Sequence, residues 1–336
     1  MKRLLVLVVL VLLVSPSFTG CTQNNQEAAA PIGVAVEFND HAACAYIARD
    51  RGLFKEAGLN LTAYESYVTG TALAAALTRG DIQVAYICLV PAISAYANAG
   101  VPIKVVAGTH KYGYGLAVNP DKIKTIEDLE KPGIRIGCVQ TGSAADVVLH
   151  KVIDKYGLNQ EIVLKNVQQM NPPKQILAIK MGKLDAAFLP EHWATMAEAS
   201  GFKMLLTAKD VWPEMQGSVL VVKEDLINSH PETVRKLVDV SQKATAWARE
   251  NPIEASRIMA SQLQSAGDQV FPTDVAETAK QLEITSEVML RSMDRLEYAT
   301  EIDPVIVQDT IDYMVSLGYI KSSFKAENIL DLRFLK

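Results

Sequence analysis

Residues 32–222 alternate between short apolar runs and longer amphipathic runs. Apolar runs such as 32–38 (IGVAVEF) and 82–89 have the length and continuity of buried parallel strands. The amphipathic runs between them place apolar residues at helical spacing, and several of them end at a glycine. Strands that alternate with helices predict parallel sheets covered by helices, and the chain beyond residue 222 is predicted to be almost entirely helical.

The pattern predicts individual elements as well as a fold class. We expect strands over residues 32–38, 61–67, 82–89, 103–107, 113–118, 135–139, 162–167, 185–189, 203–207 and 217–222. We expect the longer helices over residues 72–78, 144–156, 172–181, 191–199, 231–249 and 304–317.

One arrangement occurs twice along the chain. Gly58-Leu59-Asn60 precedes a predicted strand, a helix and the buried run 80–86, and Gly157-Leu158-Asn159 precedes the same series, ending in 182–188. Such turns are common by chance, but the matching order and spacing favour two similar α/β lobes. We predict lobe I over 32–112 plus 218–336 and lobe II over 113–217. The strands predicted at 113–118 and 217–222 would cross between the lobes and form the hinge. A cleft between two lobes is a usual binding place for a small molecule.

The first residues predict export. Lys2 and Arg3 precede an apolar run of 11 residues, Leu4 to Val14, which is too short to span a bilayer and suits a signal peptide. Phe18-Thr19-Gly20-Cys21 resembles a lipobox, so we predict a signal peptide over 1–20 and a lipid anchor on Cys21, with plain secretory cleavage as the alternative. The polar segment 21–31 reads as a flexible tether, and the folded part should lie outside the cytoplasmic membrane.

Charge and cysteine content narrow the choice of partner. Loss of residues 1–20 would leave 31 basic and 38 acidic residues, a net charge of about −7, which argues against a nucleic-acid partner. The other cysteines, Cys44, Cys88 and Cys138, are widely spaced, odd in number and set among apolar residues. We therefore expect buried reduced thiols rather than disulfides or a thiolate metal site.

Four motifs resemble a known family, and the resemblance covers nearly the whole mature chain. The motifs are residues 48–59 (ARDRGLFKEAGL), Gly70 with Ala74, Leu77, Gly80 and Asp81, Gly137 with Thr141-Gly142-Ser143, and 182–186 (GKLDA). They are similar to the periplasmic-binding-protein-like type II fold, and in particular to the solute-binding lipoproteins of nitrate/sulfonate/taurine-type ABC importers and the NMT1/THI5-like proteins. The resemblance implies a two-lobed binding protein. Relatives often carry a Trp-Glu-Pro-Tyr-like segment where this chain has 189–193 (LPEHW), which implies a different ligand.

Candidate ligand-binding residues are those at the carboxyl ends of predicted strands, where open α/β sheets bind their ligands. They are Phe38, Asn39, His41, Tyr67, Thr69, Cys88, His110, Tyr114, Gln140, Thr141, Ser143, Glu191 and Trp193. The segments 69–71 and 141–143 are predicted helix N-termini, where free backbone N–H groups would suit an anionic group of the ligand. Ordinary N-capping explains their Thr and Ser residues equally well. Aromatic residues could stack on a planar ligand, and Glu191 could accept from a ligand N–H group.

The histidines allow two further hypotheses, oxyanion binding and metal binding. His41 and His110 could hold an oxyanion when protonated, and with His192, Asp40 and Glu191 they could bind a metal only if the lobes close together. No local metal-ligand spacing occurs, so we predict no metal and no cofactor.

We expect a monomeric binding protein without catalysis that captures a small anionic or zwitterionic, sulfonate-like solute and docks on an ABC permease. A heteroaromatic such as a thiamine-precursor pyrimidine is the alternative ligand. An enzyme of pyrimidine or menaquinone synthesis on the same fold, with His41 or His110 as base and Cys88 as nucleophile, is the rival, and a sensory module is a third reading.

Overall fold

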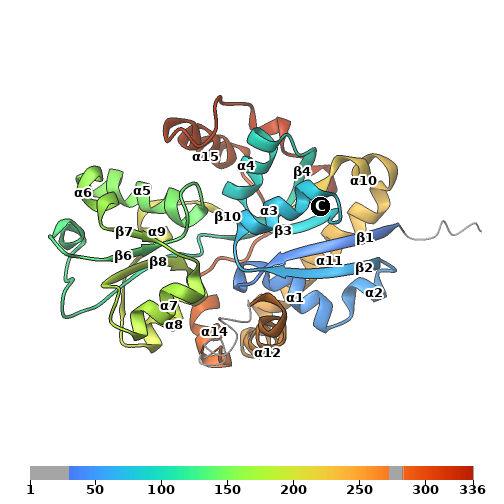
Figure 1. Ribbon diagram of the computed structural model, residues 1–336. Coiled ribbons are helices and arrows are strands. Elements are labelled where there is room, and N and C mark those ends of the chain that lie inside the picture. The colour runs from blue at the N-terminus through green and yellow to red at the C-terminus, as the bar shows by residue number, and fades with distance from the viewer. Residues whose placement is uncertain (1–29, 272–281, 283, 336) are drawn as a thin grey trace, which may run out of the picture.

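Two five-stranded mixed sheets, each covered by helices, lie side by side in the computed structural model, which describes residues 30–271, 282 and 284–335 (Figure 1). The first sheet has the order β2 (Asn60–Tyr67), β1 (Pro31–Glu37), β3 (Val84–Cys88), β10 (Gln216–Lys223) and β4 (Ile103–Lys111). The second has the order β7 (Val167–Gln169), β6 (Ile136–Cys138), β8 (Ala186–Pro190), β5 (Tyr114–Val118) and β9 (Lys203–Thr207). The predicted two-lobed α/β fold is confirmed. We call the first sheet with its helices lobe I and the second lobe II.

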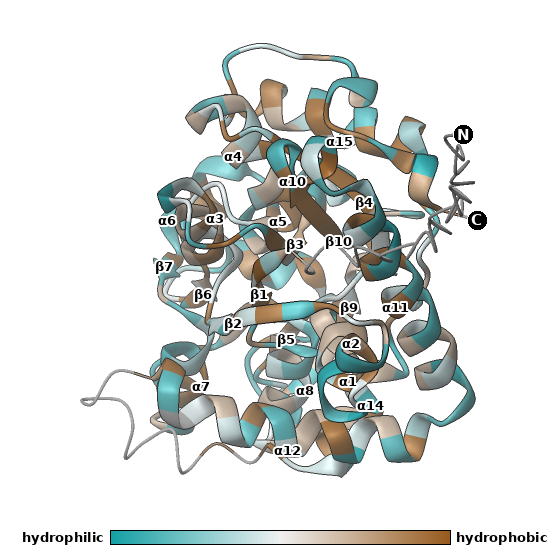
Figure 2. Cartoon of the chain, turned by 90° about the vertical axis from the view of Figure 1, so that its right-hand side faces the viewer, coloured by the Kyte–Doolittle hydropathy of each residue, from teal (hydrophilic) through white to brown (hydrophobic). Residues whose placement is uncertain are grey.

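The two sheets share one topology. In each, a central strand (β1 or β6) pairs in parallel with both neighbours, and the fourth strand (β10 or β5) runs antiparallel to the strands beside it. Strands β3 and β8 are buried along their whole length, which explains their uninterrupted apolar sequences. In Figure 2 the brown central strands of lobe I contrast with the teal outer faces of its helices.

Helices follow the predicted order. Those between the strands are α1 (Ala43–Asp50), α2 (Leu53–Glu56), α3 (Gly70–Arg79), α4 (Leu89–Ala99), α5 (Ala144–Tyr156), α6 (Gln160–Lys165), α7 (Pro172–Lys180), α8 (Glu191–Ala199) and α9 (Ala208–Val211). After β10 come α10 (Glu224–Ser229), α11 (Pro231–Glu250), α12 (Pro252–Val270), α14 (Ser286–Met293) and α15 (Pro304–Ser316). Short 3₁₀ turns lie at Asp40–Ala42, Ile126–Glu130, Ala326–Asn328 and Leu332–Phe334.

The prediction of a strand over residues 162–167 is wrong. Most of that stretch belongs to α6, and pairing with the sheet begins only at Val167. Asn159 caps this helix, its side-chain oxygen accepting a hydrogen bond from the Ile162 N–H at 3.2 Å. The second Gly-Leu-Asn turn is therefore followed by a helix and a three-residue strand, whereas the first leads directly into β2.

The motif at residues 182–186 (GKLDA) has a structural role. Asp185 is almost fully buried, and it accepts hydrogen bonds from the Arg135 guanidinium at 2.8 Å and from the Lys122 ammonium at 2.6 Å. The hydrogen bonds and charge of Arg135, with help from Lys122, outweigh burial and lower the pKa of Asp185 to about 2. Its counterpart Asp81 is exposed, so the motif anchors β8 in lobe II without an equivalent in lobe I.

The C-terminal helices contact both lobes. Helix α14 packs between α8 of lobe II and α12, as Figure 1 shows below the sheets. Helix α15 packs on α4 of lobe I, while its Tyr313 hydroxyl donates to Asp154 of α5 in lobe II at 2.6 Å. Segments that we predicted as part of lobe I thus also bridge to lobe II.

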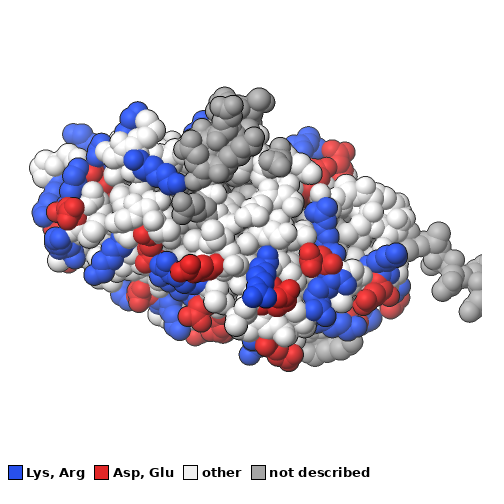
Figure 3. All heavy atoms as spheres, turned by 90° about the horizontal axis from the view of Figure 1, so that it is seen from below, with Lys and Arg blue, Asp and Glu red and all other residues white. Residues whose placement is uncertain are grey.

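The signal peptide, Cys21 and most of the tether lie outside the described residues. Within 30–271, 282 and 284–335, no helix is long and apolar enough to cross a membrane. The described Cys44, Cys88 and Cys138 are buried free thiols, as predicted. On the face seen in Figure 3, basic and acidic side chains are interspersed rather than gathered by sign.

Candidate functional site

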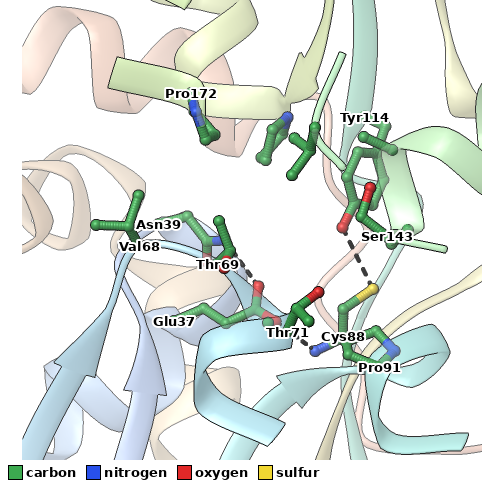
Figure 4. A pocket seen from close by; sticks show the side chains of 15 residues that line it. Glu37, Asn39, Val68, Thr69, Thr71, Cys88, Pro91, Tyr114, Ser143 and Pro172 are labelled. Atoms are coloured by element: carbon green, nitrogen blue, oxygen red, sulfur yellow. Dashed lines mark hydrogen bonds between the residues drawn. The ribbon is translucent and has the colours of Figure 1, made fainter. Parts of the chain in front are cut away.

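A small cavity lies where the two lobes face each other (Figure 4). Lobe I contributes Glu37, Asn39, Val68, Thr69, Gly70, Thr71, Cys88 and Pro91, and lobe II contributes Tyr114, Val139, Ser143, Ala144, Ala145, Pro172 and Pro190. Its volume is about 30 Å³, enough for roughly two water molecules. A solute of more than a few heavy atoms therefore fits only with the lobes further apart.

Glu37, the last residue of β1, is the charged group of this cavity. It is 3% exposed, and its Oε1 accepts from the Cys88 backbone N–H at 2.8 Å while its Oε2 accepts from Asn39 Nδ2 at 2.9 Å. Gly70 makes room for it, since a Cβ built there would lie 2.3 Å from Glu37 Oε1. The carboxylate is thus held in one orientation at the lobe I wall.

Two helices begin at the cavity, one from each lobe. The Thr69 hydroxyl accepts from the Ala72 N–H at 3.2 Å and caps α3. The Ser143 hydroxyl accepts from the Asp146 N–H at 3.3 Å and caps α5. Both side chains therefore make the ordinary N-caps that their sequence also predicts.

Cys88 and Tyr114 connect the lobes across the cavity. The Tyr114 hydroxyl donates to Cys88 Sγ at 3.3 Å (Figure 4). The Cys88 thiol donates to the Gly217 carbonyl at 3.1 Å. Burial, reinforced by the Glu37 charge, raises the pKa of Cys88 to about 12. A thiol that stays protonated is a poor nucleophile, which opposes the enzymatic role considered for it.

The His41 and His110 rings pack against each other at an interplanar angle of 44° behind the cavity, next to the crossovers between the lobes. Their ring centroids are 4.4 Å apart, and His41 Nε2 donates to the Gly113 carbonyl at 2.7 Å. Burial opposes protonation of His41, but Glu37, Asp40 and the Gly113 carbonyl outweigh it and raise its pKa above 6.5. Burial and the neighbouring His41 lower the pKa of His110 to about 3.

A second buried polar group joins the 3₁₀ turn Asp40–Ala42, α8 and the chain after α14. Asp40 Oδ1 lies 3.6 Å from His192 Nδ1, and Glu191 Oε1 lies 3.2 Å from Arg295 Nη1. Burial raises the pKa of Glu191 to about 7, although Arg295 opposes the shift. Among the described residues, no three His, Cys, Asp or Glu side chains are placed to hold a metal ion.

The structure separates the predicted site residues into two groups. Five line the cavity: Asn39, Thr69, Cys88, Tyr114 and Ser143. Eight lie outside its lining: Phe38, His41, Tyr67, His110, Gln140, Thr141, Glu191 and Trp193.

The eight lie outside for identifiable reasons. Phe38 follows Glu37 on the opposite face of the chain and packs against Trp193, with ring centroids 6.1 Å apart. His41, His110 and Glu191 are buried behind the cavity in the polar groups described above. Gln140 and Thr141 are exposed at the start of α5, and the Tyr67 hydroxyl turns to Glu65.

The sequence prediction missed the charged residue of the cavity. Glu37 is the only charged side chain in the predicted strand 32–38, and a lone carboxylate in a buried strand was the signal that could have identified it. The lining residues Val68, Pro91, Val139, Pro172 and Pro190 carry no comparable signal, because apolar and proline residues serve any packed wall.

Comparison with known proteins gives a consistent result. A family model described as the NMT1-like family matches residues 25–264. The taurine-binding periplasmic protein of Escherichia coli (strain K12) is 26% identical over 211 residues, which cover 61% of this chain and 62% of that protein. The chain thus aligns with less than two thirds of this relative's length.

Solved structures share the fold. The alkanesulfonate-binding protein SsuA from Xanthomonas axonopodis pv. citri, bound to MOPS, has a TM-score of 0.73 at 15% identity and covers 90% of this chain and 98% of its own. The periplasmic nitrate-binding protein NrtA from Synechocystis PCC 6803 has a TM-score of 0.70 at 14% identity and covers 91% of this chain and 86% of its own. At such low identity these likenesses establish the fold alone.

Proposed function

The chain belongs to the NMT1-like family, and from this premise we propose that it is an extracytoplasmic solute-binding protein that delivers a small organic solute to an ABC importer. It would act by binding and closure, without catalysis, and as a monomer. The named relatives that bind taurine, alkanesulfonate and nitrate support this class of function.

The observation that carries the proposal is the composition of the cavity wall. Strand ends and helix starts from both lobes meet there, with Glu37 and Cys88 on one side and Val139 and Pro190 on the other. A solute that touches both walls stabilises the closed arrangement over the open one by its differential affinity. The crossovers between β4 and β5 and between β9 and β10 would be the hinge, with lobe I as 32–112 plus 218–336 and lobe II as 113–217.

Two ligand classes fit this description. A zwitterionic, sulfonate-like solute would use the hydroxyls and N–H groups at the starts of α3 and α5. A heteroaromatic such as a pyrimidine would use Tyr114 and a carboxylate acceptor.

Solute-induced stabilisation tests the proposal. Purified mature protein is expected to gain several degrees in Tm with its solute, because a ligand at 100 times its Kd adds about 2.7 kcal/mol of stability. A broad solute screen by thermal unfolding, combined with native mass spectrometry of protein purified without refolding, provides the measurement. A protein that carries no small molecule and responds to no solute would count against a binding function.

We propose further that Cys21 anchors the protein to the membrane through diacylation, with residues 22–31 as tether. The motivating observation is the Phe18-Thr19-Gly20-Cys21 segment after an apolar run of signal-peptide length. Replacement of Cys21 by serine is expected to release the protein from the membrane fraction and to remove the lipid mass from its N-terminal peptide. Unchanged fractionation of the variant would support plain secretory cleavage instead.

A further inference from the structure

We propose that Glu37 makes the cavity selective for solutes that carry an ammonium or another N–H donor, and that simple anions are excluded. The inference rests on the proposed binding function and concerns the class of solute. It departs from the predicted preference for an anionic group at the helix starts.

The first support is the state of the Glu37 carboxylate. Two hydrogen bonds, from the Cys88 N–H and from Asn39, fix it at the cavity wall, and together they use only part of the acceptor capacity of its two oxygens. A buried carboxylate is costly unless a cation or further donors compensate it. A solute N–H group would supply that compensation from the cavity side.

The second support is the lack of positive charge in the wall. None of the described lining residues is Lys, Arg or His, and Glu37 is the only Asp or Glu among them. His41 lies behind this wall, with its Nδ1 3.8 Å from Glu37 Oε2, beyond hydrogen-bond distance, and its Nε2 donates to the Gly113 carbonyl. A nitrate or alkanesulfonate in the cavity would meet the Glu37 carboxylate and no Lys, Arg or His side chain in the lining.

The third support is the occupation of the helix starts by carboxylates of the protein itself. Glu37 Oε1 lies against Gly70, the first residue of α3, and accepts from Cys88, the residue that caps α4. At the start of α5, Asp146 accepts from the Gly142 N–H at 2.9 Å and from the Tyr319 hydroxyl. Positive helix ends that would attract a solute anion are therefore already next to internal negative charges.

Matched probe pairs test the inference with the mature wild-type protein. The first pair is taurine and ethanesulfonate, which differ by an ammonium group. The second pair is 4-aminopyrimidine and pyrimidine, which differ by an amino group. Sodium nitrate is the probe for an anion without any N–H group. Thermal unfolding and isothermal titration calorimetry are expected to show tighter binding of the nitrogen-bearing member of a pair by tenfold or more, and no binding of nitrate.

The variant Glu37→Gln keeps the size of the side chain and should weaken binding of that member by tenfold or more. The matched control Glu56→Gln removes a charge at the exposed end of α2 and should bind as the wild type does. The wild-type pairs give an answer even if Glu37→Gln does not fold.

Equal or tighter binding of the amine-free member, or of nitrate, overturns the inference and leaves the binding function intact. The same holds if none of the probes binds and the broad screen yields a solute without N–H groups. If neither probes nor screen yield a ligand, both the inference and the proposed function are overturned.

Discussion

Replacement of Gly217 by alanine is expected to lower the free energy of unfolding by about 3 kcal/mol. A Cβ at this position would lie 2.2 Å from His110 Cε1, 2.5 Å from His110 Nδ1 and 2.7 Å from the Tyr112 carbonyl oxygen. The His110 ring cannot easily move aside, because it is fully buried and packed against the His41 ring. The new methyl group therefore forces β10 away from the crossover after β4. Urea unfolding followed by circular dichroism measures the change.

Gly267→Ala provides the matched control. In α12 the added Cβ would meet the edge of the Phe271 ring at 3.2 Å and Phe38 Cζ at 3.8 Å, and alanine favours the helix over glycine by up to about 1 kcal/mol. This variant should be as stable as the wild type or slightly more so.

The double variant Gly217→Ala/His110→Ala separates the clash from other effects of the substitution. It removes the ring that the new Cβ would strike, so adding Gly217→Ala to His110→Ala should cost clearly less than adding it to the wild type. Equal costs in the two backgrounds would show that the contact with His110 is not the cause.

Periodicity was enough to predict the two sheets, because strands such as β3 and β8 are apolar without interruption and helices such as α3 and α5 have both a side-chain cap and a glycine stop. Helices α5 and α8 and strand β9 have the bounds that the sequence predicts. The stretch 162–167 failed because the apolar residues Ile162, Val163 and Leu164 suit a strand and a buried helix equally well, and only the Asn159 cap distinguishes them.

The candidate site was harder to predict because a strand end identifies a neighbourhood and not the direction of a side chain. Asn39, Thr69, Cys88, Tyr114 and Ser143 lie at the cavity, but the histidines at equivalent strand ends turn towards the crossovers. Their environment depends on contacts across more than 60 residues, as between His41 and Gly113. The helix starts were located by sequence, whereas the carboxylates beside them became visible only in three dimensions.

The buried Glu191 is expected to make the protein less stable as pH rises from about 4.5 to 8. Its pKa is raised from 4.5 to about 7 in the folded chain, so between these values the folded state binds more protons than the unfolded state. Stability therefore falls with rising pH, by about 3 kcal/mol for a shift of this size. His41, with a raised pKa, acts in the same direction near neutrality, and His110 and His192, with lowered pKa values, act in the opposite direction.

Comparison of the wild type with Glu191→Gln isolates this residue from the histidines, because the amide does not titrate and they are common to both proteins. The free energy of unfolding of the variant minus that of the wild type should increase by about 3 kcal/mol between pH 4.5 and pH 8, whatever its offset. Arg295→Gln should show the opposite trend, with a larger loss at pH 8 than at pH 5, because it leaves the ionised Glu191 without its partner. Parallel stability curves for the wild type and Glu191→Gln would mean that Glu191 has the same pKa in the folded and unfolded states, and that Arg295 compensates its burial fully.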